Sequence, residues 1–213
     1  MILRKDIDSF IKTINKNITL IAATKYVDPL IMEQLLTKGI NNFGENRVDD
    51  FLTKYESLKS HKEIVWHFIG HLQRNKAKKV VNKIDFLHSL DSLELAKILN
   101  DNLDKPLNCF VEVSINNEET KNGVKVDDLN NFMTKLQGFS NIKVVGLMMM
   151  AVKNSQENFL EEQFKKIEQL KERISKELNI ELPYLSIGMS DDYLIAIKHN
   201  ATHIRLGRIL YEN

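Results

Sequence analysis

The sequence predicts an α/β fold and, within that class, a single-domain (β/α)8 TIM barrel. Short apolar runs rich in β-branched residues alternate along the chain with longer segments of helical period. The runs are apolar throughout, which is typical of parallel strands that helices cover on both faces. An open, doubly wound sheet could hold such units, but the eight runs of this sequence favour closure into a barrel.

The predicted elements alternate in order along the chain. The first strand contains the apolar run at residues 20–23, and Pro29 marks the start of the helix after it. We expect strands at residues 18–24, 40–43, 64–69, 85–88, 107–114, 142–149, 183–187 and 202–206. We expect helices at residues 28–38, 46–59, 72–80, 92–102, 126–137, 156–178 and 191–199, with a further helix at 3–16. The helix at 156–178 is the clearest, with apolar residues at spacings of three and four: Phe164, Ile167, Leu170, Ile174 and Leu178.

The bulk composition is that of an ordinary globular protein. The chain has 213 residues, of which 43% are hydrophobic and 28% charged. No Gly/Ser/Pro-rich linker divides it, so we expect one domain over residues 1–213. A formal net charge of +1 argues against a dedicated nucleic-acid binder.

Three further features predict a cytoplasmic location. No apolar run approaches the roughly 20 residues that span a bilayer, and the first residues lack the apolar stretch of a signal peptide. The single cysteine, Cys109, lies in the apolar run LNCFVEVS and cannot form an internal disulfide. We expect Cys109 to be a core residue in a protein of a reducing compartment, with no membrane association.

A parallel barrel places its chemistry at the carboxyl ends of the strands. The seventh and eighth predicted strands end in SIGMSDD and RLGR, positions that often form a phosphate site in barrels. Gly188 and Gly207 let backbone N–H groups approach an oxyanion, and the Ser190 hydroxyl and the N-terminus of the next helix add donors. The alternative is that Ser190 and Asp191 only cap that helix.

Two basic residues stand at the same mouth. Lys25 follows the first strand, where partial desolvation would favour a neutral amine able to form a Schiff base with a carbonyl compound. A structural lysine paired with a barrel carboxylate explains the position equally well. Arg205 ends the eighth strand, and its guanidinium suits a carboxylate, a phosphate or an aromatic ring nitrogen.

Other patterns at the mouth do not indicate a site. His67 and His71 have the spacing of a helical metal pair, but they straddle a strand and its loop without a third ligand nearby, so we predict no metal site. The methionines of MMMAV are expected to pack in the interior. Asp191 and Asp192 are neighbours on a predicted helix, where side chains diverge by roughly 100°, so they are not expected to act as an acid–base pair.

Seven segments, read in order and spacing, resemble one family. They are AATKYVDP, NNFGENRVDD, VWHFIGHLQRNK, VEVSINNEETKNGV, VVGLMMMAV, LSIGMSDDYLIAI and THIRLGRILYEN. From about residue 18 to the C-terminus, the chain is similar to the pyridoxal phosphate homeostasis proteins. That family resembles the N-terminal barrel domain of bacterial alanine racemase and of eukaryotic ornithine decarboxylase.

The resemblance implies a site for pyridoxal 5′-phosphate (PLP). Lys25 would form a covalent aldimine with the cofactor, and Arg205 would face its pyridine nitrogen. Ser190 and the backbone of Gly207 and Arg208 would hold its phosphate. Many family members carry threonine or serine where this chain has Arg208, so the phosphate would lose a hydroxyl here and gain a guanidinium.

The resemblance also implies residues around the cofactor ring. Asn46 of FGEN and Met148 of GLMMM would line the ring or its surroundings. His67, Gly70 and Gln73 would shape the wall of the pocket, with less definite roles.

The arginine bears on whether the protein is an enzyme. Arg205 cannot accept the proton of the pyridine nitrogen, as an aspartate would, so the ring should be a weaker electron sink. Alanine racemases work with this arginine but use a catalytic tyrosine from a second domain, and the sequence ends six residues after Gly207. We therefore expect no catalytic residue, and a monomeric carrier that holds PLP for homeostasis and delivers it to apo PLP-dependent enzymes. The alternatives are a single-domain PLP-dependent amino-acid racemase and an aldolase that uses Lys25 on a sugar phosphate.

Overall fold

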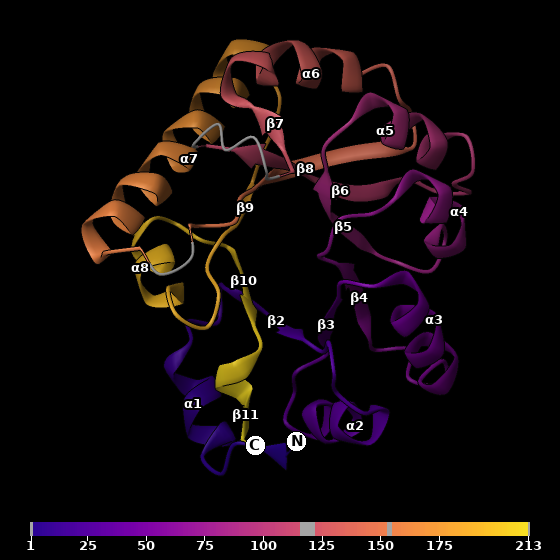
Figure 1. Ribbon diagram of the computed structural model, residues 1–213, viewed down its shortest axis with the longest axis vertical. Coiled ribbons are helices and arrows are strands. Elements are labelled where there is room, and N and C mark those ends of the chain that lie inside the picture. The colour runs from indigo at the N-terminus through magenta and orange to yellow at the C-terminus, as the bar shows by residue number, and fades with distance from the viewer. Residues whose placement is uncertain (1, 116–121, 153–154, 213) are drawn as a thin grey trace.

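The eight predicted strands form a closed parallel barrel in the computed structural model, which describes residues 2–115, 122–152 and 155–212. The strands follow chain order around the barrel, and β10 closes the ring by pairing with β2 (Figure 1). The eight are β2 (Thr19–Ala23), β3 (Asn42–Glu45), β4 (Val65–Phe68), β5 (Phe86–Leu90), β6 (Leu107–Ser114), β8 (Ile142–Met148), β9 (Tyr184–Ser186) and β10 (His203–Leu206). The predicted fold class is confirmed.

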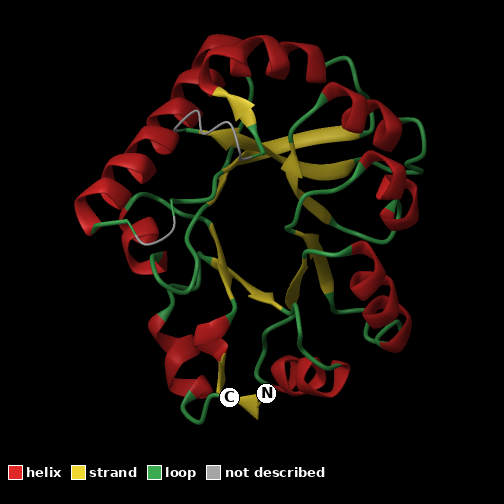
Figure 2. Ribbon diagram, in the orientation of Figure 1, coloured by secondary structure: helices red, strands yellow, loops and turns green. Residues whose placement is uncertain are grey.

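Helices surround the ring of strands on its outer side (Figure 2). Helix α2 begins where the Asp28 carboxylate accepts the N–H of Leu30, with Pro29 in the first turn. Helix α7 buries one apolar stripe, as the spacing predicted, and ends at Asn179 in a left-handed conformation. The described helices are α1 (Ile7–Thr13), α2 (Pro29–Thr37), α3 (Val48–Ser57), α4 (Ala77–Val80), α5 (Leu93–Asn100), α6 (Leu129–Leu136), α7 (Glu157–Leu178) and α8 (Tyr193–Lys198).

Three short strands and several boundaries differ from the prediction. β1 (Ile2–Leu3) pairs with β11 (Tyr211–Glu212), which brings the two ends of the chain together (Figure 1), and β7 (Val124–Lys125) extends the sheet beyond β6. Strands of two residues are too short to show a period in sequence. The helix predicted at 72–80 is a 3-10 turn followed by the single turn of α4.

The barrel interior is partly polar, although the strands are apolar runs in sequence. His67, His88 and His203 are buried there, with ring centroids 5.1–6.3 Å apart. His67 stacks on Phe86 at 4.7 Å and His88 stacks on Phe110 at 4.3 Å. A purely apolar pattern does not account for these histidines, nor for the buried polar residues Glu45, Glu112 and Arg205 of the strands.

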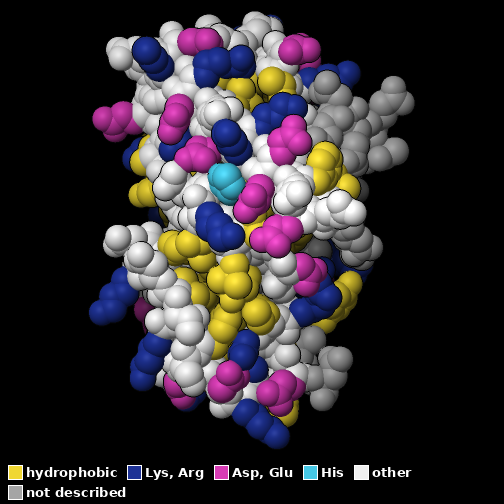
Figure 3. Space-filling view, turned by 90° about the vertical axis from the view of Figure 1, so that its left-hand side faces the viewer, with side chains coloured by type: hydrophobic (Ala, Val, Ile, Leu, Met, Phe, Trp, Pro, Cys, Tyr) yellow, Lys and Arg dark blue, Asp and Glu magenta, His cyan; other side chains and the backbone are white. Residues whose placement is uncertain are grey.

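The outer surface is mixed in character. On the side of the barrel where α7, α8 and α1 lie, hydrophobic side chains gather in one area with charged side chains around them (Figure 3). Leu194 of α8 and Phe159 of α7 are among the exposed large hydrophobic residues, whereas Cys109 is fully buried, as predicted. Among the described residues, no helix has the length and apolar character that a membrane crossing requires.

Candidate functional site

A cavity of about 830 Å³ opens at the carboxyl ends of the strands, where the sequence predicted the site. Five of the seven predicted residues line it: Lys25, Ser190, Arg205, Gly207 and Arg208. They come from the turn after β2, the loop after β9, and β10 with the turn that follows it. These segments converge because β10 lies between β2 and β9 in the barrel. The volume is that of an ordinary small-molecule pocket.

Lys25 stands on the rim of this cavity. The chain turns sharply after β2: Thr24 donates its N–H to Gly44 at 3.0 Å, and Val27 donates its N–H back to Thr24 at 2.9 Å. Tyr26 has a left-handed backbone with φ of 67°, which completes the turn. This turn carries the Lys25 side chain outward, so it is exposed and not partly desolvated as the sequence suggested. Among the described residues Lys25 forms no ion pair, and its Nζ lies 5.9 Å from the centroid of the Tyr26 ring.

A different lysine pairs with the barrel carboxylate beneath this turn. Lys54 of α3 donates to Glu45 Oε1 at 2.6 Å and to the Thr24 carbonyl oxygen at 2.7 Å. The Thr24 hydroxyl donates to the same Glu45 oxygen at 2.5 Å. The structural role that the sequence left open for Lys25 is therefore filled by Lys54. The sequence pattern missed Lys54 because it stands on a helix nine positions after Glu45.

The anion side of the cavity is built by the loop after β9. Gly188 has φ of 93°, and a Cβ atom there would lie 2.7 Å from the Ala196 Cβ, so only glycine fits. The loop then places Ser190 Oγ where two backbone N–H groups converge, from Gly207 at 3.2 Å and Ile209 at 3.4 Å. Backbone amides and a hydroxyl that meet at one point suit an oxyanion.

The capping alternative for this loop is wrong. Helix α8 begins at Tyr193, and neither Ser190 nor Asp191 caps it. Asp192 instead accepts the N–H of Met189 at 2.5 Å and thereby shapes the loop. Asp191 is exposed and pairs with the Arg208 guanidinium, which is also exposed at the cavity edge.

Arg205 is the buried cation of the site. Its Nη1 donates to Ser186 at 2.8 Å for the carbonyl oxygen and 2.6 Å for Oγ, and its Nη2 donates to the Met149 carbonyl at 3.0 Å. Burial lowers the pKa of Arg205 to about 10, while the charges of Glu112 and Asp192 act in the opposite direction. The guanidinium therefore remains charged at neutral pH, and its hydrogen-bond acceptors in the described part of the chain are all neutral.

Glu112 also lines the cavity, and the sequence prediction did not include it. It is a buried residue of β6, and burial raises its pKa to about 7, with the charge of Asp91 adding to the effect and that of Arg205 opposing it. A carboxylate in the middle of the apolar run LNCFVEVS was the available signal. Such a residue must face either solvent or a site, and the helices cover the outside of the barrel.

Asn46 and Met148 do not line the cavity. Met148 is buried against Phe110 and Val145, and its strand position pairs with Glu112. Asn46 follows β3 and is half-buried, and its Oδ1 is buried with no hydrogen-bond partner in the described part of the chain. The structure brings neither side chain to the cavity surface.

The residues of the third-strand motif are spread over different surroundings. His67 points into the barrel, whereas His71 is exposed and lies 3.3 Å from Asp91, so the two do not meet as a metal pair. Gly70 is required where it stands, because a Cβ there would lie 2.4 Å from the Asn46 carbonyl oxygen. Gln73 is exposed outside the cavity.

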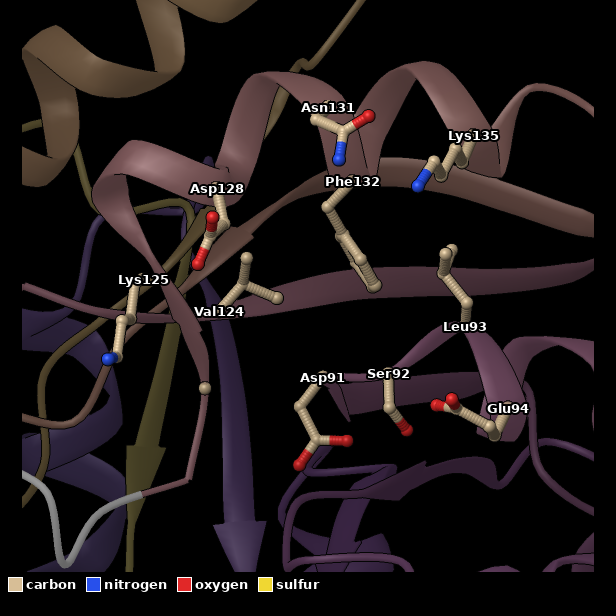
Figure 4. A pocket seen from close by; sticks show the side chains of 11 residues that line it. Asp91, Ser92, Leu93, Glu94, Val124, Lys125, Asp128, Asn131, Phe132 and Lys135 are labelled. Atoms are coloured by element: carbon tan, nitrogen blue, oxygen red, sulfur yellow. The ribbon is translucent and has the colours of Figure 1, made fainter.

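A second hollow of about 380 Å³ lies between the start of α5 and the β7–α6 segment (Figure 4). Its walls carry charges of both signs: Asp91, Glu94, Asp128, Lys125 and Lys135. None of the predicted site residues contributes to it. The mixed charge does not favour a phosphate, so the cavity at Lys25 is the candidate site.

Solved structures with the same fold include one with PLP bound. PipY of Synechococcus elongatus, solved with PLP bound, is 27% identical and superposes with a TM-score of 0.91 over 97% of this chain and all of that one. Alanine racemase from Corynebacterium glutamicum shares the fold with a TM-score of 0.78, at 13% identity over 96% of this chain and 59% of that one.

The sequence comparisons define the class of protein. Residues 11–213 match the family model described as the alanine racemase N-terminal domain, so the molecule is a barrel of that type. The pyridoxal phosphate homeostasis protein of Aquifex aeolicus is 36% identical over 90% of this chain and 85% of its own length. The protein of the same name from Synechocystis sp. is 35% identical over 94% of both chains. The chain belongs to the pyridoxal phosphate homeostasis protein family.

Proposed function

We propose that this protein binds PLP in the cavity at Lys25 and acts in PLP homeostasis as a carrier of the cofactor. The observation that carries the proposal is that one cavity of about 830 Å³ holds an exposed lysine, an oxyanion site and a buried arginine. Among the described residues, that lysine has no ion-pair partner. An aldehyde, a phosphate and a ring nitrogen are three of the groups by which PLP can be held. The cavity offers a matching partner for each.

Each residue has one task in this proposal. Lys25 would hold the cofactor through its amine, as an aldimine with the aldehyde carbon of PLP. The Ser190 hydroxyl and the backbone N–H groups of Gly207 and Arg208 bind the phosphate. Arg205 donates toward the pyridine nitrogen. When bound, PLP would supply an electron-accepting ring.

The same residues favour a carrier over an enzyme. Arg205 stays protonated, so it cannot accept the proton of the pyridine nitrogen and leaves the ring a weak electron sink. Lys25 is exposed, so water can reach the bond that holds the cofactor. Reversible hydrolysis of that bond suits release to apo PLP-dependent enzymes, and we propose a monomer as the carrying form.

One observation favours a second function, amino-acid racemisation. Racemisation needs a group that exchanges a proton at neutral pH, and the pKa of Glu112 is about 7 within the same cavity. If the protein is a racemase, alanine or serine will lose its optical activity at a steady rate, and Glu112→Gln will abolish that rate. Absence of turnover in the PLP-loaded protein will favour the carrier.

Absorption spectroscopy tests the binding proposal. The protein incubated with PLP and freed of excess cofactor should show a visible band, which Lys25→Ala and Lys25→Arg both abolish. Lys198→Ala is the control, because Lys198 is an exposed lysine of α8 outside the cavity. A colourless wild type, or a band that survives in Lys25→Arg, would refute covalent binding at Lys25. Borohydride trapping of a sugar phosphate on Lys25 without PLP would instead favour an aldolase.

A transfer experiment tests the carrier role. The loaded protein is mixed with an apo PLP-dependent enzyme, and the rate of activation is compared with that given by the same concentration of free PLP. A carrier should activate the enzyme while keeping the free PLP concentration low. No activation after complete mixing would contradict delivery while leaving binding intact.

A further inference from the structure

A continuous chain of hydrogen bonds crosses the barrel interior from the cavity to the opposite end. Arg205 Nη1 lies 2.6 Å from Ser186 Oγ, which lies 2.9 Å from His88 Nδ1. His88 Nε2 lies 2.9 Å from His67 Nδ1, and His67 Nε2 lies 2.9 Å from Asn42 Oδ1. Asn42 is the first residue of β3, at the end of the barrel away from the cavity.

Arginine fixes the direction of every bond in this chain. A guanidinium can only donate, so Ser186 Oγ accepts from Arg205 and gives its single hydrogen to His88 Nδ1. His88 must then carry its proton on Nε2 and donate to His67, which must do the same toward Asn42. The chain continues outward, because Asn42 Nδ2 donates to Asn41 Oδ1 at 2.9 Å and Asn41 Nδ2 donates to the Glu63 carbonyl oxygen at 2.9 Å.

Both histidines are suited to this neutral role. Burial holds the pKa of His67 and the pKa of His88 well below their usual range, and the nearby His203 disfavours the charged form of both, as His67 and Arg205 do at His88. Stacking on Phe86 and Phe110 fixes the planes of their rings. The ring nitrogens are therefore held in line, and hydrogen bonds in series polarise one another in such a setting.

We propose that Ser186, His88 and His67 are positioning residues that orient the Arg205 guanidinium toward the pyridine nitrogen of PLP without neutralising it. A carboxylate in contact with Arg205 would also orient the guanidinium, but it would neutralise the positive charge that faces the cofactor. The acidic groups that face Arg205 are Glu112 of β6 and Asp192 of the loop after β9, and among the described residues the guanidinium forms no ion pair with either. The inference rests on the proposed function.

Loss of the chain has a defined consequence. Without the Ser186 hydroxyl, Arg205 loses one acceptor and is free to turn toward the Glu112 carboxylate. PLP should then bind more weakly, by about threefold to tenfold for one hydrogen bond, and the pH midpoint of its visible band should shift. His67→Phe should act in the same sense from the far side of His88, because it leaves His88 Nε2–H without its acceptor.

The test is a double-mutant cycle on the full chain, read out by the dissociation constant for PLP and the pH midpoint of the visible band. Ser186→Ala already disconnects the histidines, so adding His67→Phe to it should change neither quantity further. His203→Phe is the matched control. His203 is a buried histidine of the same interior, but its hydrogen bond goes to Thr202 and not to a member of the Arg205–Asn42 series. Effects that multiply in the double variant, or His67→Phe behaving as His203→Phe does, would overturn the inference.

A cofactor-free measurement separates this inference from the proposed function. The nitrogen NMR shifts of the apo protein should show His67 and His88 as neutral Nε2–H tautomers at neutral pH and also below the usual pKa of a histidine, and Ser186→Ala should change the shifts of His88. An Nδ1–H tautomer for either ring would refute the proposed series of hydrogen bonds, even if PLP binds as proposed. If Ser186→Ala does not fold, Asn42→Leu removes the acceptor of the His67 Nε2–H at a half-buried position and should shift the His67 resonance.

Discussion

Two lysines lie beside the end of β2, and their surroundings are opposite. Lys54 is 7% exposed and contacts both Glu45 and Thr24, whereas Lys25 is exposed and unpaired among the described residues. A buried ammonium needs its partners to offset the cost of leaving water, so Lys54 cannot leave its place without leaving Glu45 unpaired. An exposed ammonium has no such constraint. The barrel thus separates a lysine that holds the fold from one that is free to react.

The largest expected effect is the loss of Lys54. In Lys54→Met the Glu45 carboxylate keeps only the Thr24 hydroxyl, and a buried charge without its partner costs about 3–5 kcal/mol of the free energy of unfolding. Denaturant unfolding followed by circular dichroism measures this loss. The double variant with Glu45→Gln should recover part of it, because the orphaned charge is then gone. A loss below about 1 kcal/mol in the single variant would place Lys54 with the surface lysines.

The second prediction concerns a buried carboxyl that has no lysine beside it. The pKa of Glu112 is about 7 in the fold against an ordinary value of 4.5, so the folded chain binds the extra proton. The contribution of Glu112 to stability is complete below pH 4.5 and is lost as the pH rises through 7, about 3 kcal/mol in all. Urea midpoints between pH 5 and pH 8 should fall in the wild type by more than in Glu112→Gln. Equal slopes in the two proteins would contradict the raised pKa.

The sequence identified Lys25 but not its neighbour, and the reason is geometric. Strand order alone places every strand end at one mouth, so Lys25, Ser190 and Arg205 were predicted to meet before any contact was known. The Lys54–Glu45 pair depends instead on how α3 packs against the barrel. No local pattern carries that information.

The misplaced expectations have the same origin. The prediction that Lys25 is partly desolvated was wrong because the left-handed turn at Tyr26 directs the side chain outward. That direction depends on the local backbone of a three-residue turn. Met148 pairs in register with the cavity residue Glu112, and Asn46 directly follows β3, yet neither side chain lines the cavity. The interior histidines were invisible as a set because each sits on a different strand. The barrel fold and the end of the barrel that carries the site can be predicted from the hydrophobic periodicity of the sequence. The pairing of side chains from different helices and strands cannot.

A smaller effect should come from Thr24, which joins the two lysine sites. Thr24→Val keeps the shape of the side chain but removes the hydroxyl that donates to Glu45, which should cost about 1–2 kcal/mol. Thr134→Val on the exposed face of α6 is the matched control and should change stability by less than about 0.5 kcal/mol. If the two variants unfold at the same denaturant concentration, Thr24 does not support the Glu45 carboxylate.

The smallest effect on stability should belong to Lys25 itself. Lys25→Ala removes no ion pair among the described residues and no buried surface, so the free energy of unfolding of the apo protein should change by less than about 0.5 kcal/mol. The same variant should lose the visible PLP band entirely. Lys54→Met should behave in the opposite way: its free energy of unfolding should fall, but the protein should keep the visible PLP band at a temperature where it is folded. The reason is that Lys54 contacts the carbonyl of Thr24 and does not line the cavity. A destabilised Lys25→Ala would mean that the exposed lysine also holds the turn, and the separation of roles between the two lysines would fail.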